Sequence, residues 1–330
     1  MSLVEIEDLH VELPVRAGTV HAVRGVSLTV ERGETLCIVG ESGCGKSTAA
    51  LAAMGLLPRH ARLRAGRFSF QGKDLTHAGR RQLAALRGNR MGMIFQDAMT
   101  SLNPSYTVAN QLCEVYRRHQ GGSRKDAWDR ALFLLDRVGM TNAAERMEQY
   151  PHQLSGGLRQ RVMIAMALMC GPDLLIADEP TSALDVTIQI QILRLLRDLQ
   201  QEFGMGMLFI THDLGVVAGI ADRVAVMYAG EVIEIGSAED VLRRAAHPYS
   251  QGLLHSAPVL GAGRGAPLES IPGVVPSLLE RPQGCAFHGR CPHARAECIA
   301  APVAMRRADE GHCARCILID SPAMETAHAV

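Results

Sequence analysis

The chain has 330 residues, of which 47% are hydrophobic, and its 34 basic and 34 acidic residues give a formal net charge of zero at neutral pH. A balanced charge provides no global attraction to nucleic acid, so we expect no nucleic-acid partner. The sequence contains no run of about 18 apolar residues, the length needed to cross a bilayer, and we expect membrane association only through partner proteins. The length exceeds one ordinary domain, which predicts two structural units with a substantial core.

Residues 3–30 are expected to form antiparallel strands, and the apolar run of residues 35–39 is typical of a buried strand. This run is followed by the phosphate-loop pattern, two glycines separated by four residues and then Lys and Ser, in the segment Gly40-Glu41-Ser42-Gly43-Cys44-Gly45-Lys46-Ser47-Thr48. Backbone N–H groups of such a loop, together with the N-terminus of a helix expected over residues 47–56, would hold phosphate oxygens. Lys46 would reach the β and γ phosphates of a nucleotide, and the Ser47 hydroxyl would bind Mg²⁺.

Another apolar strand is expected at residues 91–95, and residues 97–170 are expected to form a helical insertion with a helix over residues 123–138. Near the end of the insertion a further helix opens at the segment Leu154-Ser155-Gly156-Gly157-Leu158-Arg159-Gln160. A Ser-Gly-Gly turn at a helix N-terminus attracts phosphate, yet no phosphate-binding residues accompany it in the sequence. This predicts that its nucleotide is held by another subunit.

Two carboxylates, Asp178 and Glu179, follow the buried strand expected at residues 174–177. Adjacent acidic groups at the carboxyl end of a buried strand are poorly explained by packing, although capping the next helix is the usual alternative. In phosphoryl transfer such a pair divides the work, and we assign Asp178 to Mg²⁺ and Glu179 to the base that polarises the attacking water. A third core strand, residues 207–211, ends before His212.

These motifs, in this order, resemble those of the ATP-binding cassette (ABC) ATPases, whose signature is Leu-Ser-Gly-Gly-x-x-Gln shortly before the Asp-Glu strand. The resemblance implies an α/β fold of the P-loop NTPase type, with a RecA-like parallel core, an antiparallel β subdomain and a helical subdomain. It also implies that two such domains pair head to tail, with ATP between the phosphate loop of one and the signature of the other. The signature residues acting in trans would be Ser155, Gly156, Gly157 and Gln160.

The same resemblance implies roles for four further positions. Gln96 matches the glutamine that senses Mg²⁺ and the transmembrane partner, and His212 matches the switch histidine at the γ-phosphate. Ser182 and Asp185 match the loop that links the two facing sites. The family usually has an aromatic residue that stacks on adenine at the end of the first strand, where this chain has Leu13. With Val20 and His21 as the nearest later candidates, we expect weaker base selectivity but retained ATP binding.

A narrower resemblance connects the chain to the ATPase subunits of dipeptide, oligopeptide and nickel importers. Residues 95–104 resemble the branch pattern Phe-Gln-Asp-Pro-Met-Thr-Ser-Leu-Asn-Pro except that Ala98 replaces proline, and residues 178–189 match without interruption. The helix after Asp185 is expected to bury Ile188, Ile192, Leu195 and Leu199. A short helix is expected at residues 238–244, and the tail then carries His247-Pro248-Tyr249 and Pro272-Gly273-Val274-Val275-Pro276.

Five of the nine cysteines fall within the final 46 residues. The chain start lacks the basic and apolar pattern of a secretion signal, so metal binding is a better explanation than disulfides. By resemblance to the branch, the ligands of a 4Fe-4S cluster would be Cys285, Cys291, Cys298 and Cys316, with Cys313 as a possible substitute. Zinc and free thiols remain alternatives. Of the other cysteines, Cys37, Cys113 and Cys170 are expected in the core, and alkylation of Cys44 in the phosphate loop is expected to block ATP binding.

The resemblance therefore predicts an ATP-hydrolysing subunit that powers import of dipeptides or oligopeptides, with ATP and Mg²⁺ as ligands. Its partners would be two transmembrane permease subunits, a second ATPase subunit and, indirectly, an extracytoplasmic substrate-binding protein. The chain would lie peripherally at the cytoplasmic face of the cell (inner) membrane. We expect a nucleotide-binding domain over residues 1–240 and a small, irregular, cysteine-rich extension over residues 241–330. A nickel or glutathione importer, a cassette ATPase of a soluble complex and a redox-sensing regulator remain alternatives.

Overall fold

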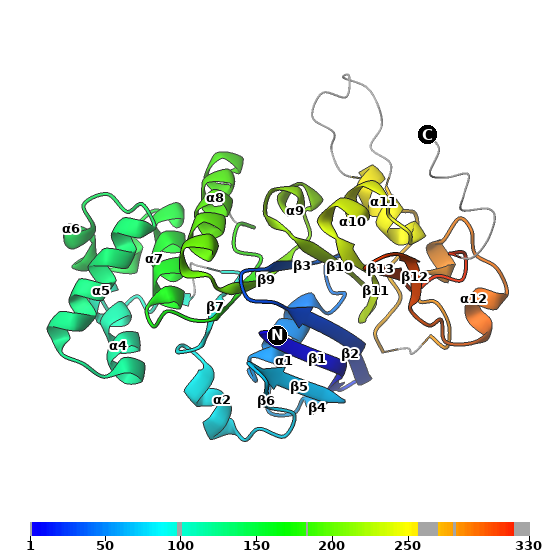
Figure 1. Ribbon diagram of the computed structural model, residues 1–330, viewed down its shortest axis with the longest axis horizontal. Helices are drawn as coiled ribbons and strands as arrows, with labels where there is room; N and C mark the ends of the chain where they lie inside the picture. Colours follow the sequence, from blue (N-terminus) through cyan, green and yellow to red (C-terminus); the bar gives the residue numbers. More distant parts are fainter. Residues whose placement is uncertain (1, 98–100, 183, 257–269, 280–281, 320–330) are drawn as a thin grey trace. The chain divides into compact units, whose positions relative to one another are not determined.

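The structure is a computed structural model that describes residues 2–97, 101–182, 184–256, 270–279 and 282–319 (Figure 1). The chain forms two compact units. One, the helical unit, consists of residues 1–3, 30–34 and 77–209, and the other, the phosphate-loop unit, of residues 4–29, 35–76 and 210–330. No helix within the described ranges combines the length and apolar character needed to cross a membrane.

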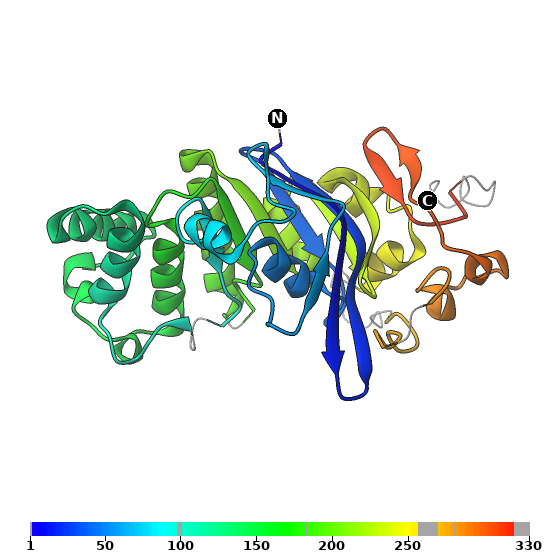
Figure 2. The same ribbon diagram turned by 90° about the horizontal axis from the view of Figure 1, so that it is seen from below.

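An antiparallel sheet forms one layer of the phosphate-loop unit. It contains β1 (Val4–Val15), β2 (Gly18–Val30), β4 (Arg62–Arg64), β5 (Arg67–Phe70) and β6 (Lys73–Asp74), in the order β2-β1-β5-β6 with β4 beside β1. Figure 2 shows β1 and β2 as a long hairpin. Burial alternates along β1 at Val4 and Ile6 and, after a change of phase at the exposed Glu7 and Asp8, again at Leu9 and Val11. The antiparallel strands expected between residues 3 and 30 are confirmed.

The second layer of this unit is built on β3 (Thr35–Val39), all five residues of which are buried. The neighbouring strand β10 (Arg223–Tyr228) pairs parallel to β3, with Ile38 opposite Ala225. The sheet continues through β11 (Glu231–Ser237), β13 (His312–Ala314) and β12 (Arg306–Asp309), all antiparallel. The cysteine-rich tail thus adds two strands to the edge of the sheet. The phosphate-loop unit also contains the helices α1 (Lys46–Ala53), α9 (Leu214–Ile220), α10 (Ala238–Arg243) and α11 (Pro248–Ser256).

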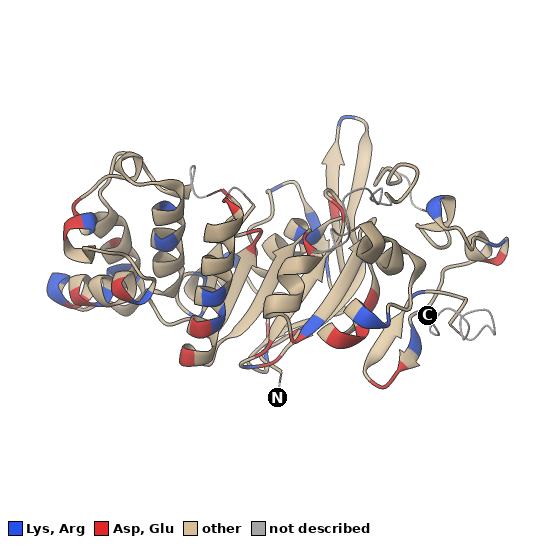
Figure 3. Cartoon of the chain, turned by 90° about the horizontal axis from the view of Figure 1, so that it is seen from above, with Lys and Arg blue, Asp and Glu red and all other residues tan. Residues whose placement is uncertain are grey.

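The helical unit contains the parallel strands β7 (Met91–Ile94) and β8 (Leu174–Asp178), with Met93 opposite Ile176. Strand β9 (Gly206–Thr211) begins in this unit. The helices of the unit are α2 (Arg80–Leu86), α4 (Val108–Gln120), α5 (Arg124–Arg137), α6 (Ala143–Met147), α7 (Gly156–Leu168) and α8 (Val186–Phe203), with the single turn η1 (Pro151–Gln153) before α7. Basic and acidic residues are interspersed along these helices (Figure 3).

Helix α5 shows how local sequence sets these elements. Ser123 accepts a hydrogen bond from the Asp126 N–H, and the Asp126 carboxylate accepts one from the Ser123 N–H, so a capping box fixes the start of the helix. The buried face then repeats at helical spacing through Ala127, Ala131, Leu134 and Leu135. The helix predicted over residues 123–138 is confirmed.

The buried face of α8 differs from the prediction. The structure buries Ile192, Leu196, Leu199 and Gln200, whereas Ile188 and Leu195 are only half-buried. Helical periodicity defines a stripe, but the first two turns of α8 are poorly covered, and Val186 and Ile190 are 72% and 45% exposed. Among the cysteines, Cys37 is buried, but Cys113 and Cys170 are half-buried and do not belong to the core.

Between α11 and β12, the described residues of the tail form turns and two very short helices, η2 (His288–Arg290) and α12 (Glu297–Ala300). The Cys285 N–H donates to the carbonyl of Cys298 across 2.7 Å, which closes the chain between them into a compact loop. A Cβ at Gly284 would lie 2.1 Å from the same carbonyl oxygen, so only glycine fits there.

Candidate functional site

The phosphate loop lies between β3 and α1, and two of its glycines are required by close backbone contacts. Gly40 has a φ of +150°, and a Cβ at this position would lie 2.2 Å from the carbonyl oxygen of Met227. Gly45 has a φ of +105°, and its Cβ would lie 2.2 Å from the carbonyl oxygen of Ala22. No other residue can adopt these positions without moving β10 or β2. The loop is therefore held tightly against the backbone of both strands.

Lys46 is 4% exposed, and its Nζ donates to the carbonyl oxygens of Gly40 and Glu41 at 2.7 and 3.1 Å. Its ammonium group therefore lies against the loop's own backbone. Ser47 and Thr48, in the first turn of α1, are half-buried, and Ser42 and Gly43 are exposed. The structure thus brings a buried ammonium, a helix N-terminus and an exposed glycine-rich turn together, which is the arrangement that binds phosphate.

Cys44 does not share the exposure of its neighbours. Its side chain is fully buried, and burial raises the pKa of its thiol. A buried protonated thiol reacts slowly with alkylating reagents because the thiolate is the reactive species. Alkylation of Cys44 in the folded protein is therefore expected to be slow, and a block of ATP binding by a thiol reagent stays a prediction for conditions in which the protein opens.

The positions predicted near adenine lie on the β1–β2 hairpin, where Leu13, Val20 and His21 are half-buried. The His21 ring lies 3.3 Å from the Glu12 carboxylate, and the His21 backbone N–H donates to the carbonyl of Leu278. Residues 4–30 contain no Phe, Tyr or Trp. The hairpin therefore offers an apolar and imidazole surface, and the tail lies against it at Leu278.

In the helical unit, Asp178 is the last residue of β8 and Glu179 follows it directly. Asp178 is buried at 6% exposure, and Glu179 is half-buried with a left-handed backbone φ of +45°. Such a φ is strained for a residue other than glycine and clusters at functional positions. The Gln96 side chain, after β7, donates to the Glu179 carboxylate across 3.1 Å. The structure therefore brings together two residues that lie 83 positions apart in sequence.

The loop between β8 and α8 is anchored to the same carboxylate-bearing residue. The Ser182 hydroxyl donates to the Glu179 carbonyl at 3.2 Å, and Asp185 caps α8 by accepting from the Ile188 N–H at 3.0 Å. Residue 183 of this loop, and residues 98–100 after Gln96, lie outside the described residues.

The signature segment opens α7 with Ser155 as its N-cap, and the Ser155 hydroxyl accepts from the Leu158 N–H. Ser155 and Gly156 are exposed, and apart from the adjacent residues and the helix's own backbone no described atom lies within 4 Å of the position that a Cβ would occupy at Gly156. At Gly157 a Cβ would meet the Ile188 side chain at 3.3 Å. This helix end therefore presents an open surface on the helical unit.

Gln160 departs from the predicted set. It is 3% exposed, and its buried Nε2 has no hydrogen-bond partner among the described residues. Only the N-terminal end of α7, at Ser155 and Gly156, is exposed. Gln160 lies one turn further along the helix, and its side chain is packed in the interior. Gln160 therefore does not belong to the open surface that Ser155 and Gly156 form.

His212 follows β9 and is exposed in the phosphate-loop unit. The predicted residues are thus divided between the two units. The phosphate loop, Leu13, His21 and His212 belong to one, and Gln96, Asp178, Glu179, the signature and the loop at residues 182–185 belong to the other.

The four predicted tail cysteines, Cys285, Cys291, Cys298 and Cys316, line one small cavity. The pKa of Cys285 is raised to about 11, chiefly by burial; a hydrogen bond from the Phe287 N–H opposes this rise, and the nearby thiols of Cys316, Cys298 and Cys291 add to it. The sulfurs of Cys291 and Cys316 likewise accept from the backbone two residues ahead, and Cys298 accepts from the Arg295 N–H at 3.4 Å. Cys313 lies on β13 and does not line the cavity.

The cavity also includes His247, whose buried Nε2 has no hydrogen-bond partner in the part of the chain that the structure describes. Its volume is about 10 Å³, room for roughly one water molecule. Within the described ranges, no group of three or more His, Cys, Asp or Glu side chains has the geometry to hold a single metal ion. The donors therefore gather without forming a single-ion site.

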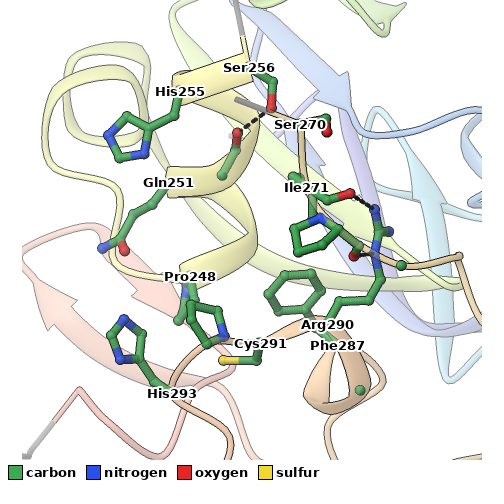
Figure 4. A pocket seen from close by; sticks show the side chains of 15 residues that line it. Pro248, Gln251, His255, Ser256, Ser270, Ile271, Phe287, Arg290, Cys291 and His293 are labelled. Carbon is green, nitrogen blue, oxygen red and sulfur yellow. Dashed lines mark hydrogen bonds between the residues drawn. The ribbon is translucent and has the colours of Figure 1, made fainter. Parts of the chain in front are cut away.

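A second cavity of about 510 Å³ lies beside the cysteines, and Figure 4 shows its lining. Gln251 and His255 come from α11, and Arg290, Cys291 and His293 come from the tail. Arg290 and the network around it were not identified from the sequence. No local motif marks them, because their partners are far away along the chain.

Comparison with known proteins identifies the same two parts of the chain, the segment that contains the phosphate loop and the C-terminal extension. Residues 23–182 match the family model described as ABC transporter, and residues 233–298 match the oligopeptide/dipeptide transporter C-terminal region. The chain is 48% identical to the dipeptide transport ATP-binding protein DppD of Bacillus subtilis, over 97% of this chain and 96% of that protein. It is 52% identical to the oligopeptide transport ATP-binding protein OppD of Salmonella typhimurium, over 91% of this chain and 89% of that protein.

Solved structures share the fold. A dimeric post-hydrolysis structure of the ATP-binding cassette MJ0796 bound to ADP and Pi has a TM-score of 0.63 and 27% identity, and it covers 71% of this chain and 98% of that one. CbiO1 from Clostridium perfringens, part of an ABC transporter complex, has a TM-score of 0.63 and 30% identity, over 74% of this chain and 91% of that one. The chain thus belongs to the ABC ATPase family, in the branch that carries the oligopeptide/dipeptide transporter C-terminal region.

Proposed function

We propose that this chain is the ATP-hydrolysing subunit of an importer for dipeptides or oligopeptides. One observation carries the proposal: proteins named for dipeptide and oligopeptide transport share about half of their residues with this chain over nearly its whole length, tail included. We assign residues 1–240 to the nucleotide-binding domain, with its helical subdomain near residues 97–170, and residues 241–330 to the extension. Uptake of nickel or glutathione instead of peptides would identify another importer of the same branch.

The proposed chemistry is hydrolysis of MgATP. The phosphate loop would hold the phosphates through backbone N–H groups and Lys46, with the half-buried Leu13 and His21 nearest to adenine. Ser47, Gln96 and Asp178 would hold Mg²⁺, which neutralises charge on the phosphates. Glu179 would orient and deprotonate the attacking water, and His212 would contact the γ-phosphate. The 3.1 Å hydrogen bond between Gln96 and Glu179 supports a shared role, because it joins the proposed metal ligand to the proposed base.

We propose that a second ATPase subunit, identical or homologous, completes each nucleotide site. The support is the open end of α7, a helix of 13 residues whose exposed N-terminal residues Ser155 and Gly156 offer N–H groups and a partial positive charge. Gly157 would approach the partner's nucleotide at the same helix end. Ser182 and Asp185 would link the two sites, since their loop is anchored at Glu179.

Two permease subunits are the proposed membrane partners, with the chain peripheral at the cytoplasmic face and the substrate-binding protein contacted only through them. Exposed aromatic side chains support a docking surface beside residues 101–103. Phe95 is 42% exposed and Tyr106 is 53% exposed, and both belong to the helical unit. Exposed aromatic side chains are enriched at protein interfaces.

The test is Glu179→Gln, which keeps the size of the side chain and its hydrogen bond from Gln96 but removes the base. ATP binding should persist, and steady-state hydrolysis should fall by at least about 100-fold. Glu148→Gln, an exposed carboxylate in the same unit, is the matched control and should hydrolyse ATP normally. Undiminished turnover in Glu179→Gln would remove Glu179 from its proposed role.

Substrate choice requires the assembled transporter. With the permeases and the binding protein in liposomes, ATP-dependent uptake of a labelled dipeptide should exceed uptake of nickel and glutathione. If the liposomes take up no peptide, nickel or glutathione while the chain hydrolyses ATP normally in solution, the chain would instead belong to a soluble complex without transport.

We further propose that the tail binds a 4Fe-4S cluster through Cys285, Cys291, Cys298 and Cys316. The support is four converging thiols, each accepting a backbone N–H, and a lining that includes Nε2 of His247, which has no partner among the described residues. A cluster assigns each cysteine to a different iron, so it does not require convergence on one point, as zinc does. Because the cavity has only about 10 Å³, the side chains must move outward on binding.

Anaerobically purified protein should contain about four irons per chain and absorb visible light through sulfur-to-iron charge transfer. Cys298→Ser should lose both signals, and Cys313→Ser should keep them. Protein that contains zinc, or no metal, would refute the cluster.

A further inference from the structure

A single arginine of the tail connects the extension to the phosphate loop. The Arg290 guanidinium donates two parallel hydrogen bonds to the Glu41 carboxylate, at 2.7 and 3.0 Å. Further donors reach the carbonyls of Ile271 and Pro272 at 3.2 and 3.0 Å, as Figure 4 shows for Ile271, and the Tyr228 hydroxyl at 3.4 Å. The guanidinium also lies 5.8 Å from the ring centre of Tyr228, at the end of β10. The pairing joins residues 249 positions apart in sequence.

Burial distinguishes this ion pair from an ordinary surface salt bridge. The Arg290 side chain is 6% exposed and that of Glu41 is 30% exposed. Surface pairs contribute little because water screens them, whereas a desolvated bidentate pair is strong and directional. The planar guanidinium satisfies the carboxylate and two carbonyls at once, which a lysine ammonium cannot do.

Glu41 is held at a second point. Its backbone N–H donates to the Tyr249 hydroxyl at 2.9 Å, and its carbonyl accepts from Lys46 at 3.1 Å. Tyr249 belongs to α11 and packs against Phe287, with ring centres 5.3 Å apart, next to the turn that carries Arg290. The backbone and side chain of Glu41 are therefore both fixed by residues C-terminal to β11.

A carboxylate inside a phosphate loop needs such restraint. Glu41 follows Gly40, whose carbonyl also accepts from the Lys46 ammonium. An unpaired negative charge there would repel the phosphates of a nucleotide and compete for Lys46. Pairing with Arg290 neutralises the charge and directs the side chain toward the tail.

We propose that Arg290 is a positioning residue for nucleotide binding, which acts through Glu41 by neutralising and orienting its carboxylate. The extension is then part of the nucleotide site rather than an appendage to it. Arg290 directly precedes the cavity cysteine Cys291. A structural change at the cysteines would therefore move Arg290 and alter its pairing with Glu41 in the phosphate loop. The inference rests on the proposed nucleotide site.

The experiment measures the Kd of ATP for the full chain by isothermal titration calorimetry. Arg290→Met should raise the Kd about tenfold, because it leaves the Glu41 carboxylate unpaired beside the phosphates. Adding Glu41→Gln to Arg290→Met should restore the Kd to within about threefold of the wild-type value, since the repelling charge is gone. Arg290→Lys should lie between Arg290→Met and the wild type.

Arg315→Met is the matched control, because Arg315 also directly precedes a cavity cysteine but donates to the carbonyls of Val232 and Val303 instead. It should leave the Kd within about twofold. An Arg290→Met Kd equal to the wild-type value, or an equal loss in the double variant and in Arg290→Met, would overturn the proposal, the latter by showing simple loss of structure. Failure of the wild-type chain to bind ATP would instead refute the proposed function.

Discussion

Replacing Glu234 by alanine should destabilise the phosphate-loop unit strongly. Glu234 lies on β11 with no exposed surface, and its carboxylate accepts three hydrogen bonds. The donors are the backbone N–H groups of Ala246 and His247, at 2.7 and 2.9 Å, and Nε2 of His312 at 2.7 Å. The two backbone donors directly precede α11, so the carboxylate occupies the position where a helix N-terminus favours negative charge.

The expected loss follows from what remains after the change. Three buried donors lose a charged acceptor, and each such bond contributes about 1.5–3 kcal/mol. Relaxation and entry of water recover part of the sum, and breaking a buried charged pair costs about 3–5 kcal/mol in comparable cases. We therefore expect a loss of about 4 kcal/mol in the free energy of unfolding of this unit.

The assay must report on the correct unit. The single tryptophan, Trp128, lies on α5 in the helical unit and would not detect the change directly. Hydrogen exchange of the α11 amides, read by mass spectrometry in increasing urea, follows the affected helix. The matched control is Asp309→Ala on β12 of the same sheet, where the carboxylate is 61% exposed and pairs with Arg244 at 3.5 Å, and its expected loss is below about 1 kcal/mol. Equal α11 protection in the two variants would refute the reasoning.

Three further predictions concern the same unit. Gly40→Ala should raise the Kd of ATP at least about tenfold, because the new Cβ would lie 2.2 Å from the Met227 carbonyl oxygen, and a titration showing unchanged affinity would contradict the loop geometry. Burial lowers the pKa of His247 to about 4. Between about pH 6.5 and 4 this histidine is therefore protonated in the unfolded chain but neutral in the folded chain. Stability of the metal-free protein should therefore fall by about 3 kcal/mol between pH 6.5 and 4, and His247→Gln should flatten this part of a urea-midpoint profile. Cys44 should react with a thiol reagent only as fast as the protein opens, which mass mapping with and without urea would show, and rapid labelling in native buffer would disprove its burial.

The sequence predicts well those features that depend on neighbours along the chain. The phosphate loop is contiguous, and its glycines mark the backbone positions that β2 and β10 approach closely. The start of α5 follows from the Ser123 and Asp126 pair, and α5, β3, β7, β8 and β9 lie where apolar periodicity places them. Glu179 was identified because an acidic pair at the end of an apolar strand is unusual in its own local context.

Where the prediction of burial was wrong, residues far away in the sequence determined which side chains are covered. Periodicity defined the apolar stripe of α8, but which turns are covered depends on other elements, so Ile188 is half-buried and Leu196 is buried. Gln160 belongs to a signature pattern, yet the packing around α7 encloses it while Ser155 stays exposed. A pattern of residue types carries no record of what will lie against each face.

The sequence by itself therefore determined the local chemistry of this protein: a phosphate loop, an acidic strand end and a helix that opens with Ser-Gly-Gly. Only the tertiary structure decided how the tail takes part. Glu234 with its three donors, and Arg290 with Glu41, are ion pairs and hydrogen bonds whose partners are separated by up to 249 residues. Their energy depends on burial and on geometry within a few ångströms, and both of these arise only when strands and helices far apart in the chain pack together.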